Sequence, residues 1–183
     1  QRLLALAREA VAAAAAGQPP PTVDAERLPA ALLRPAAAFV TLEHAGELRG
    51  CIGGLEAHWP LYEDVRRHAA QAATQDYRFE PVTPAEVPEL EVEISVLTEP
   101  QPLAYAEPAE LPGRLQPGLD GVTLAYGQRR ATFLPQVWER VPEPERFLSM
   151  LCEKMGLPPE TWRQTKLDVS IYHVEKVTES ELE

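Results

Sequence analysis

The residues best suited to chemistry lie in one short segment, Glu47-Leu48-Arg49-Gly50-Cys51-Ile52-Gly53-Gly54. This segment holds one of the chain's two cysteines, together with three glycines and an arginine two positions before the thiol. A thiol reacts mainly as its thiolate, and a nearby cation or a run of oriented backbone amides favours that form. Glycine has no Cβ, so its backbone can adopt positive φ or be approached closely by a ligand. Cys51 is therefore the first candidate for a reactive residue.

Nucleophilic catalysis needs a thiolate, a group that stabilises it and donors for a developing oxyanion. Here Cys51 is the predicted nucleophile and Arg49 the predicted cation. The ligand-binding residues are predicted to be Gly50, Ile52, Gly53 and Gly54, whose backbone amides face an anion. Two alternatives stay open: Cys51 is a buried small hydrophobic residue in a bulged strand, or Arg49 forms an internal salt bridge, for example with a glutamate of the strand expected at 89–97. Two histidines close to Cys51 in the sequence, His44 and His58, are candidate partners for its thiol.

The segment is predicted to be the second strand of a hairpin, because strands at 37–43 and 47–53 flank the turn His44-Ala45-Gly46. A helix at 60–75 follows it. The clearest strand pattern is at 89–97, where Leu90, Val92, Ile94 and Val96 alternate with Glu91, Glu93 and Ser95.

The remaining elements complete a mixed pattern. Helices are expected at 2–16 and 144–155 with a helical turn around 30–33, strands at 121–126, 130–134 and 168–177, and a solvated acidic tail at the end. The proline-rich stretch 98–118 is expected to be a lobe boundary or a mobile connection. Hairpins outnumber βαβ units, so we predict an α+β fold with a largely antiparallel sheet and flanking helices. Cys152 is expected on the buried face of the helix at 144–155.

Composition excludes several classes of function. The net charge is −11 and the 17 Lys and Arg residues are scattered, so neither DNA nor RNA is an expected partner. The chain contains no apolar run of about 18 residues, so no membrane span is expected. Two distant cysteines do not make a secreted disulfide framework, and both thiols are expected to be free in the cytoplasm.

Metal and nucleotide motifs are missing as well. The four histidines show neither the spacing of a zinc site nor a neighbouring C-x-x-C, so we expect no metal. The segment around Cys51 lacks the lysine of a P-loop and the spacing of a dinucleotide fingerprint. We expect no cofactor.

Several blocks of the chain resemble one known family. They are Phe39-Val40-Thr41-Leu42, Leu48-Arg49-Gly50-Cys51-Ile52-Gly53, Asp76-Tyr77-Arg78-Phe79, Leu90–Leu97, Leu134–Trp138 and Gly156–Trp162. In this order they resemble the AMMECR domain family, whose bacterial and archaeal members are called AmmeMemoRadiSam system protein A. Residues 1–183 are therefore expected to form a single AMMECR-like domain with two unequal lobes.

The resemblance also implies a functional setting. The family has no assigned reaction, and its prokaryotic members commonly belong to a system with a Memo-like protein and a radical S-adenosylmethionine protein. These proteins are the expected partners, and iron or S-adenosylmethionine chemistry would reside in them. We expect a cytosolic enzyme component that acts on a small anionic or carbonyl metabolite at a cleft around Arg49–Gly53. The alternative is a non-catalytic binding or docking module of the same system.

Overall fold

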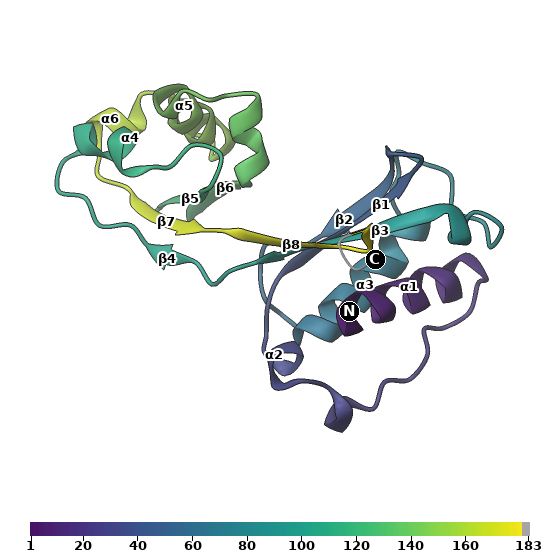
Figure 1. Ribbon diagram of the computed structural model, residues 1–183. Helices are drawn as coiled ribbons and strands as arrows, with labels where there is room; N and C mark the ends of the chain where they lie inside the picture. The colour runs from purple at the N-terminus through teal and green to yellow at the C-terminus, as the bar shows by residue number, and fades with distance from the viewer. Residues whose placement is uncertain (181–183) are drawn as a thin grey trace. The chain divides into compact units, whose positions relative to one another are not determined.

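The computed structural model describes residues 1–180 and divides them into two compact units (Figure 1). Unit 1 comprises residues 1–97 together with the chain from residue 175 onward, and unit 2 comprises residues 98–174. Each unit has its own four-stranded sheet and its own hydrophobic core. The predicted α+β fold with largely antiparallel pairing is confirmed.

Unit 1 is a sheet with two long helices on one face (Figure 1). Its elements are α1 Arg2–Ala15, a 3₁₀ turn η1 Ala25–Arg27, α2 Ala30–Leu33, β1 Ala38–His44, β2 Glu47–Gly53, α3 Leu61–Thr74, η2 Val87–Glu89, β3 Leu90–Leu97 and most of β8 Val174–Thr178. The strand order is β2-β1-β3-β8, which places β2 at an edge. Alternate residues of β1 and β3, such as Val40 and Ile94, are fully buried against the apolar stripes of α1 and α3.

The hairpin that carries Cys51 has a tight turn and one irregularity. Ala45 and Gly46 both adopt positive φ, at 53° and 79°, as a two-residue hairpin turn requires. The register then shifts between Leu42 and Glu43, whose partners on β2 are Gly50 and Leu48. Arg49 is therefore the extra residue of a β-bulge.

Unit 2 packs short helices on a second antiparallel sheet. Its elements are β4 Gln101–Pro102, η3 Pro108–Glu110, α4 Leu111–Arg114, β5 Gly121–Tyr126, β6 Arg129–Phe133, η4 Pro135–Glu139, α5 Pro144–Lys154, α6 Thr161–Gln164 and β7 Asp168–Tyr172, with the strand order β4-β7-β5-β6. The rings of Trp138 and Phe147 stack at 3.7 Å in the core. Cys152 is fully buried there, and this burial raises the pKa of its thiol.

Three expectations from the sequence need correction. The strand expected at 168–177 is two strands, β7 and β8, which break at His173 and belong to different sheets. The stretch 98–118 begins at the first residue of unit 2, and it is not a bare connection, because it contains β4, η3 and α4. In the acidic end, Glu179 is not a solvated tail residue, because its carboxylate pairs with the guanidinium of Arg8. Residues 181–183 of that end lie outside the described part of the chain.

None of the helices within residues 1–180 is long and apolar enough to span a membrane.

Candidate functional site

Cys51 lies on the face of the unit 1 sheet opposite to α1 and α3. Its neighbour Ile52 packs into the core beneath those helices, and successive side chains of a strand point to opposite faces. The thiol is half-buried and free, and Thr41 Oγ1 donates a hydrogen bond to Cys51 Sγ at 3.4 Å. This contact fixes the position of the sulfur on the face that the helices leave open.

A row of polar side chains crosses that face at the level of Cys51. Thr41 of β1 pairs with Cys51 on one side and with Glu93 of β3 on the other. Glu93 in turn forms an ion pair with Lys176 of β8, at 3.1 Å from Nζ to Oε1. The register thus places a thiol, a hydroxyl, a carboxylate and an ammonium group in sequence across four strands.

The loop after α3 covers the edge of β2 and holds the backbone of Cys51. The Cys51 amide donates to Asp76 Oδ2 at 2.8 Å, and Arg78 Nη2 donates to the Cys51 carbonyl at 3.3 Å. Arg78 is itself fixed by Asp76, at 2.9 Å from Nε to Oδ1 and 2.7 Å from Nη2 to Oδ2. We call Asp76 and Arg78 the edge clamp, because together they pair with the edge strand as a neighbouring strand would.

The clamp also determines the charge near the thiol. The hydrogen bonds from Arg78 are the main cause that holds the pKa of the Asp76 carboxyl well below its usual range, and the Cys51 amide adds to this effect. The hydrogen bonds with Asp76 raise the pKa of Arg78, and a negative charge on Cys51 contributes to the same increase. Arg78 is therefore held as a cation beside the backbone of Cys51.

Arg49, the predicted cation, has other partners in the structure. Its Nε donates to Glu86 Oε1 at 3.0 Å and its Nη1 donates to the carbonyl of Glu80 at 2.9 Å. The pKa of Glu86 is lowered to about 2, first by the backbone amide of Thr83 and then by Arg49. The salt bridge left open by the sequence is thus present, with a glutamate that precedes β3 instead of one within it. The bulge at Arg49 also interrupts the regular alternation of side chains along β2.

The glycines beside Cys51 are required for close packing within the protein. A Cβ on Gly50 would lie 2.3 Å from the carbonyl oxygen of Ala72 in α3, and a Cβ on Gly53 would lie 2.3 Å from the ring of Phe39. Neither glycine, nor Gly54, is among the residues with positive φ. The Gly54 amide donates to the carbonyl of Ala38 at 3.2 Å, so this amide and that of Cys51 are already engaged.

Comparison with known proteins identifies this chain. The AMMECR1 family model matches residues 4–177. The chain belongs to the AMMECR1 family. A protein of Thermofilum pendens is 45% identical over 128 residues, which are 67% of this chain and 58% of that protein. A protein of Methanothermobacter thermautotrophicus is 43% identical over 141 residues, covering 74% of this chain and 73% of that protein.

An AMMECR1-like fold is also known from a solved structure. The crystal structure of an uncharacterized protein from Pyrococcus horikoshii superposes with a TM-score of 0.77 at 33% sequence identity, covering 97% of this chain and 90% of that one.

No histidine hydrogen-bonds to Cys51 in the described part of this AMMECR1-family protein. Each one pairs with a carboxylate instead: His44 with Glu89, His58 with Glu56, His68 with Asp64 and His173 with Asp120. Residues 1–180 also contain no cluster of three or more His, Cys, Asp or Glu side chains suited to a metal ion. Cys51 thus lacks a histidine base, and the acid–base group nearest to it in the sheet register is Glu93.

Sequence reasoning missed four residues of the candidate site: Thr41, Asp76, Arg78 and Glu93. For two of them a signal was present, because Glu93 faces away from the core in the alternating pattern of 89–97 and Thr41 lies in the partner strand of the hairpin. Asp76 and Arg78 lie in a block shared with the family, but nothing local shows that this loop returns to the edge of β2. The role of Cys51 stays a prediction, while Arg49 and the glycines of the same segment have contacts other than the predicted ones.

Proposed function

We propose that this AMMECR1-family protein is a cysteine-dependent enzyme that acts on a small anionic or carbonyl-bearing metabolite at the open face of the unit 1 sheet. The row from Cys51 through Thr41 to Glu93 carries the proposal, because it combines a nucleophile with a carboxylate on one face. Arg78 is the cation of this site. Arg49 and the glycines Gly50, Gly53 and Gly54 support the strand that displays the thiol, and Ile52 anchors it in the core.

The residues have distinct roles in the proposed step. The Cys51 thiol gives its proton to Glu93, two strands away, through a chain of bound water molecules, and the sulfur then forms a bond with the substrate carbonyl carbon. The π electrons of that carbonyl move to its oxygen, which takes up a proton from the protonated Glu93. The hydroxyl of Thr41 holds the sulfur in place, and Arg78 attracts an anionic substrate toward the thiol.

The setting of the reaction is part of the same proposal. The protein acts in the cytoplasm with a Memo-like protein and a radical S-adenosylmethionine protein, in which any iron or S-adenosylmethionine chemistry takes place. A second candidate function is a non-catalytic docking module of that system. One observation favours it: Tyr77, between the two clamp residues, is 96% exposed although its neighbours are fixed.

Competitive alkylation tests the enzyme proposal. Native protein is treated with limiting iodoacetamide, and the two cysteines are quantified by peptide mass spectrometry. Cys51 is expected to react at least about tenfold faster than Cys152, which is fully buried. Iodoacetate is the anionic counterpart of iodoacetamide. The ratio of its alkylation rate to that of iodoacetamide is expected to be higher at Cys51 than at free cysteine, because Arg78 attracts the carboxylate of iodoacetate.

Variants separate an activated thiol from one that is merely exposed. Thr41→Val and Arg78→Gln are expected to slow the alkylation of Cys51 by roughly twofold to tenfold, since each removes a group that stabilises the thiolate. Thr161→Val is the matched control, because it also removes a threonine hydroxyl, but that hydroxyl donates to the carbonyl of Pro158 at 2.7 Å within unit 2. If Cys51 reacts no faster than Cys152, or if the three variants behave alike, the thiol is not activated and the docking module becomes the better proposal.

A further inference from the structure

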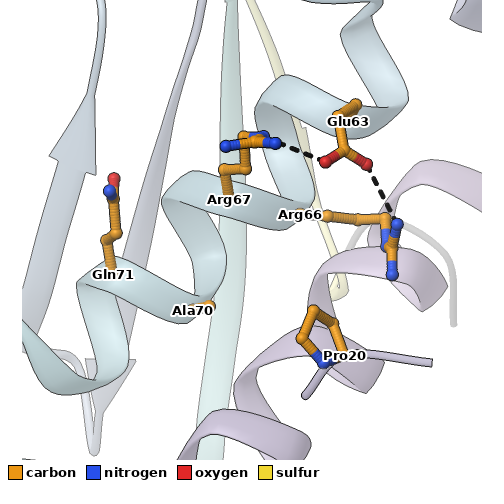
Figure 2. A pocket seen from close by; sticks show the side chains of 6 residues that line it. All are labelled: Pro20, Glu63, Arg66, Arg67, Ala70 and Gln71. Atoms are coloured by element: carbon orange, nitrogen blue, oxygen red, sulfur yellow. Dashed lines mark hydrogen bonds and ion pairs between the residues drawn. The ribbon is translucent and has the colours of Figure 1, made fainter. Parts of the chain in front are cut away.

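A pocket of about 320 Å³ lies on the side of α3 that faces away from the sheet (Figure 2). Pro20, Glu63, Arg66, Arg67, Ala70 and Gln71 line it. All these residues belong to unit 1, and α3 covers the sheet face opposite to that of Cys51. The pocket is therefore separate from the thiol site, with the sheet between them.

The two arginines of the pocket have different roles. Arg66 is a fixed wall residue: its Nη1 donates to Glu63 Oε2 at 3.0 Å, its Nη2 donates to the carbonyl of Pro21, and its side chain is only 11% exposed. This contact holds the segment after α1 against α3. Arg67 donates to Glu63 from Nε alone, at 2.9 Å, and its side chain is 50% exposed.

Arg67 is also oriented before any ligand arrives. Its guanidinium carbon lies 4.2 Å from the centre of the Trp59 ring, so the ring and Glu63 together hold the group in place. Nη1 and Nη2 of Arg67 form no hydrogen bond to residues 1–180. A guanidinium with two free terminal nitrogens can bind a carboxylate or phosphate through two parallel hydrogen bonds, which an ammonium group cannot do.

The rest of the pocket suits the same kind of ligand. Gln71 lies one helical turn after Arg67, and its side-chain amide forms no hydrogen bond within the described chain (Figure 2). Glu63 neutralises only one of the two arginines, so the pocket keeps one positive charge in a chain whose net charge is −11. Pro20 and Ala70 add an apolar surface beside these donors.

We propose that this pocket binds a small organic anion whose carboxylate or phosphate group is held by Arg67 and Gln71. The volume is at the lower end of the range for small-molecule sites and exceeds what a single oxyanion group fills. The ligand therefore has a further, largely apolar part, which packs against Pro20 and Ala70. The inference is independent of the chemistry proposed for Cys51.

Three aromatic probes of similar size test the charge requirement: phenyl phosphate, benzoate and benzylamine. Binding is followed by tryptophan fluorescence, because Trp59 is 45% exposed beneath Arg67 while Trp138 and Trp162 are buried. Both anions are expected to give saturable changes and the cation none. The tighter of the two anions identifies whether phosphate or carboxylate is the preferred group. If neither anion saturates up to about 10 mM, or if benzylamine binds equally well, the proposal is overturned.

Substitutions of Arg67 and Gln71 test whether the anion binds in this pocket. Arg67→Gln is expected to weaken the better anion by about tenfold, and Gln71→Leu by a smaller factor, with the melting temperature unchanged. Arg114→Gln is the matched control, because Arg114 also forms an i,i+4 ion pair, with Glu110, and its side chain is 55% exposed. Calorimetry repeats the measurement without relying on Trp59. Anion binding that is unchanged in Arg67→Gln would show that the ligand lies elsewhere and would overturn the assignment.

Discussion

At the scale of single residues, the carboxylate of Asp76 has two tasks. It accepts a hydrogen bond from the edge-strand amide of Cys51, and it orients the guanidinium of Arg78 that contacts the Cys51 carbonyl. The Asp76 side chain is only 3% exposed. Replacing it with asparagine would remove the charge that compensates Arg78 and would weaken the acceptor for the Cys51 amide.

Asp76→Asn is therefore expected to lower the free energy of unfolding by about 2–4 kcal/mol near neutral pH. Chemical denaturation measures this loss. Asp24→Asn is the control, because Asp24 pairs with Arg27 at 3.2 Å on the surface. This substitution is expected to lower the free energy of unfolding by no more than about 1 kcal/mol. Equal effects of the two substitutions would show that the clamp adds nothing to an ordinary surface pair.

The pH dependence of the same residue follows from its depressed pKa. A carboxyl whose pKa is lower in the folded protein than in the unfolded chain stabilises the fold fully above its unfolded pKa, near 4. This stabilisation is lost as the pH falls below that value toward the folded pKa. Between pH 5 and pH 3 the stability difference between the natural protein and Asp76→Asn should therefore shrink.

At the scale of elements, the contact of β2 with α3 depends on Gly50. An added Cβ would lie 2.3 Å from the carbonyl oxygen of Ala72 and 3.2 Å from its carbon, and both are backbone atoms that cannot turn aside. Gly50→Ala is expected to cost about 2–4 kcal/mol of stability, because the strand and the helix must separate. Gly54→Ala is the control, since the nearest atom to its Cβ would be His68 Cε1 at 3.5 Å. Thermal and chemical unfolding of the two variants measure the difference, and similar stabilities would refute the packing role of Gly50.

Elements were predictable from the sequence wherever a local pattern determines them. The alternation of 89–97 gives β3, the helical period of 60–75 gives α3, and the short glycine turn gives the β1–β2 hairpin. The break at His173 was missed because β7 and β8 read as one continuous run, and only their pairing in different sheets separates them.

The candidate site was less predictable because its contacts are long-range. Asp76 and Arg78 act on Cys51 across 25 and 27 residues, and nothing near either block specifies that meeting. The bulge at Arg49 is likewise a property of the strand pair and cannot be read from β2 alone. The closeness of Arg49 and Cys51 in the sequence therefore did not predict the contacts of the arginine. Local patterns therefore identified the strand of the site, and pairing supplied its partners.

At the scale of the whole molecule, the two units differ in how the chain builds them. Unit 2 is one continuous segment, 98–174, that contains all four strands of its sheet and both buried tryptophans, Trp138 and Trp162. Unit 1 is discontinuous, because it needs the chain from residue 175 onward to return and add β8 beside β3. That return also brings Glu179 to Arg8 and to the amide of Val92, at 3.0 Å.

The two hydrophobic cores have no residue in common, so each unit should be testable as a separate fragment. The fragment 98–174 is expected to unfold cooperatively and to keep the near-ultraviolet circular dichroism of its packed tryptophans.

The fragment 1–97 is expected to be markedly less stable, because β3 loses its neighbour and Arg8 loses the carboxylate that it contacts through Nε at 2.6 Å. Joining 1–97 to 175–183 through a short flexible linker should restore the stability of unit 1. A short linker suffices because the Thr98 amide donates to the His173 carbonyl at 2.9 Å, so the two points at which the chain passes between the units lie close together. Glu179→Gln in the joined fragment should undo part of the gain. A fragment 98–174 without a cooperative transition would show that unit 2 does not fold apart from the rest of the chain. A fragment 1–97 as stable as the joined one would show that β8 and Glu179 add nothing to the stability of unit 1.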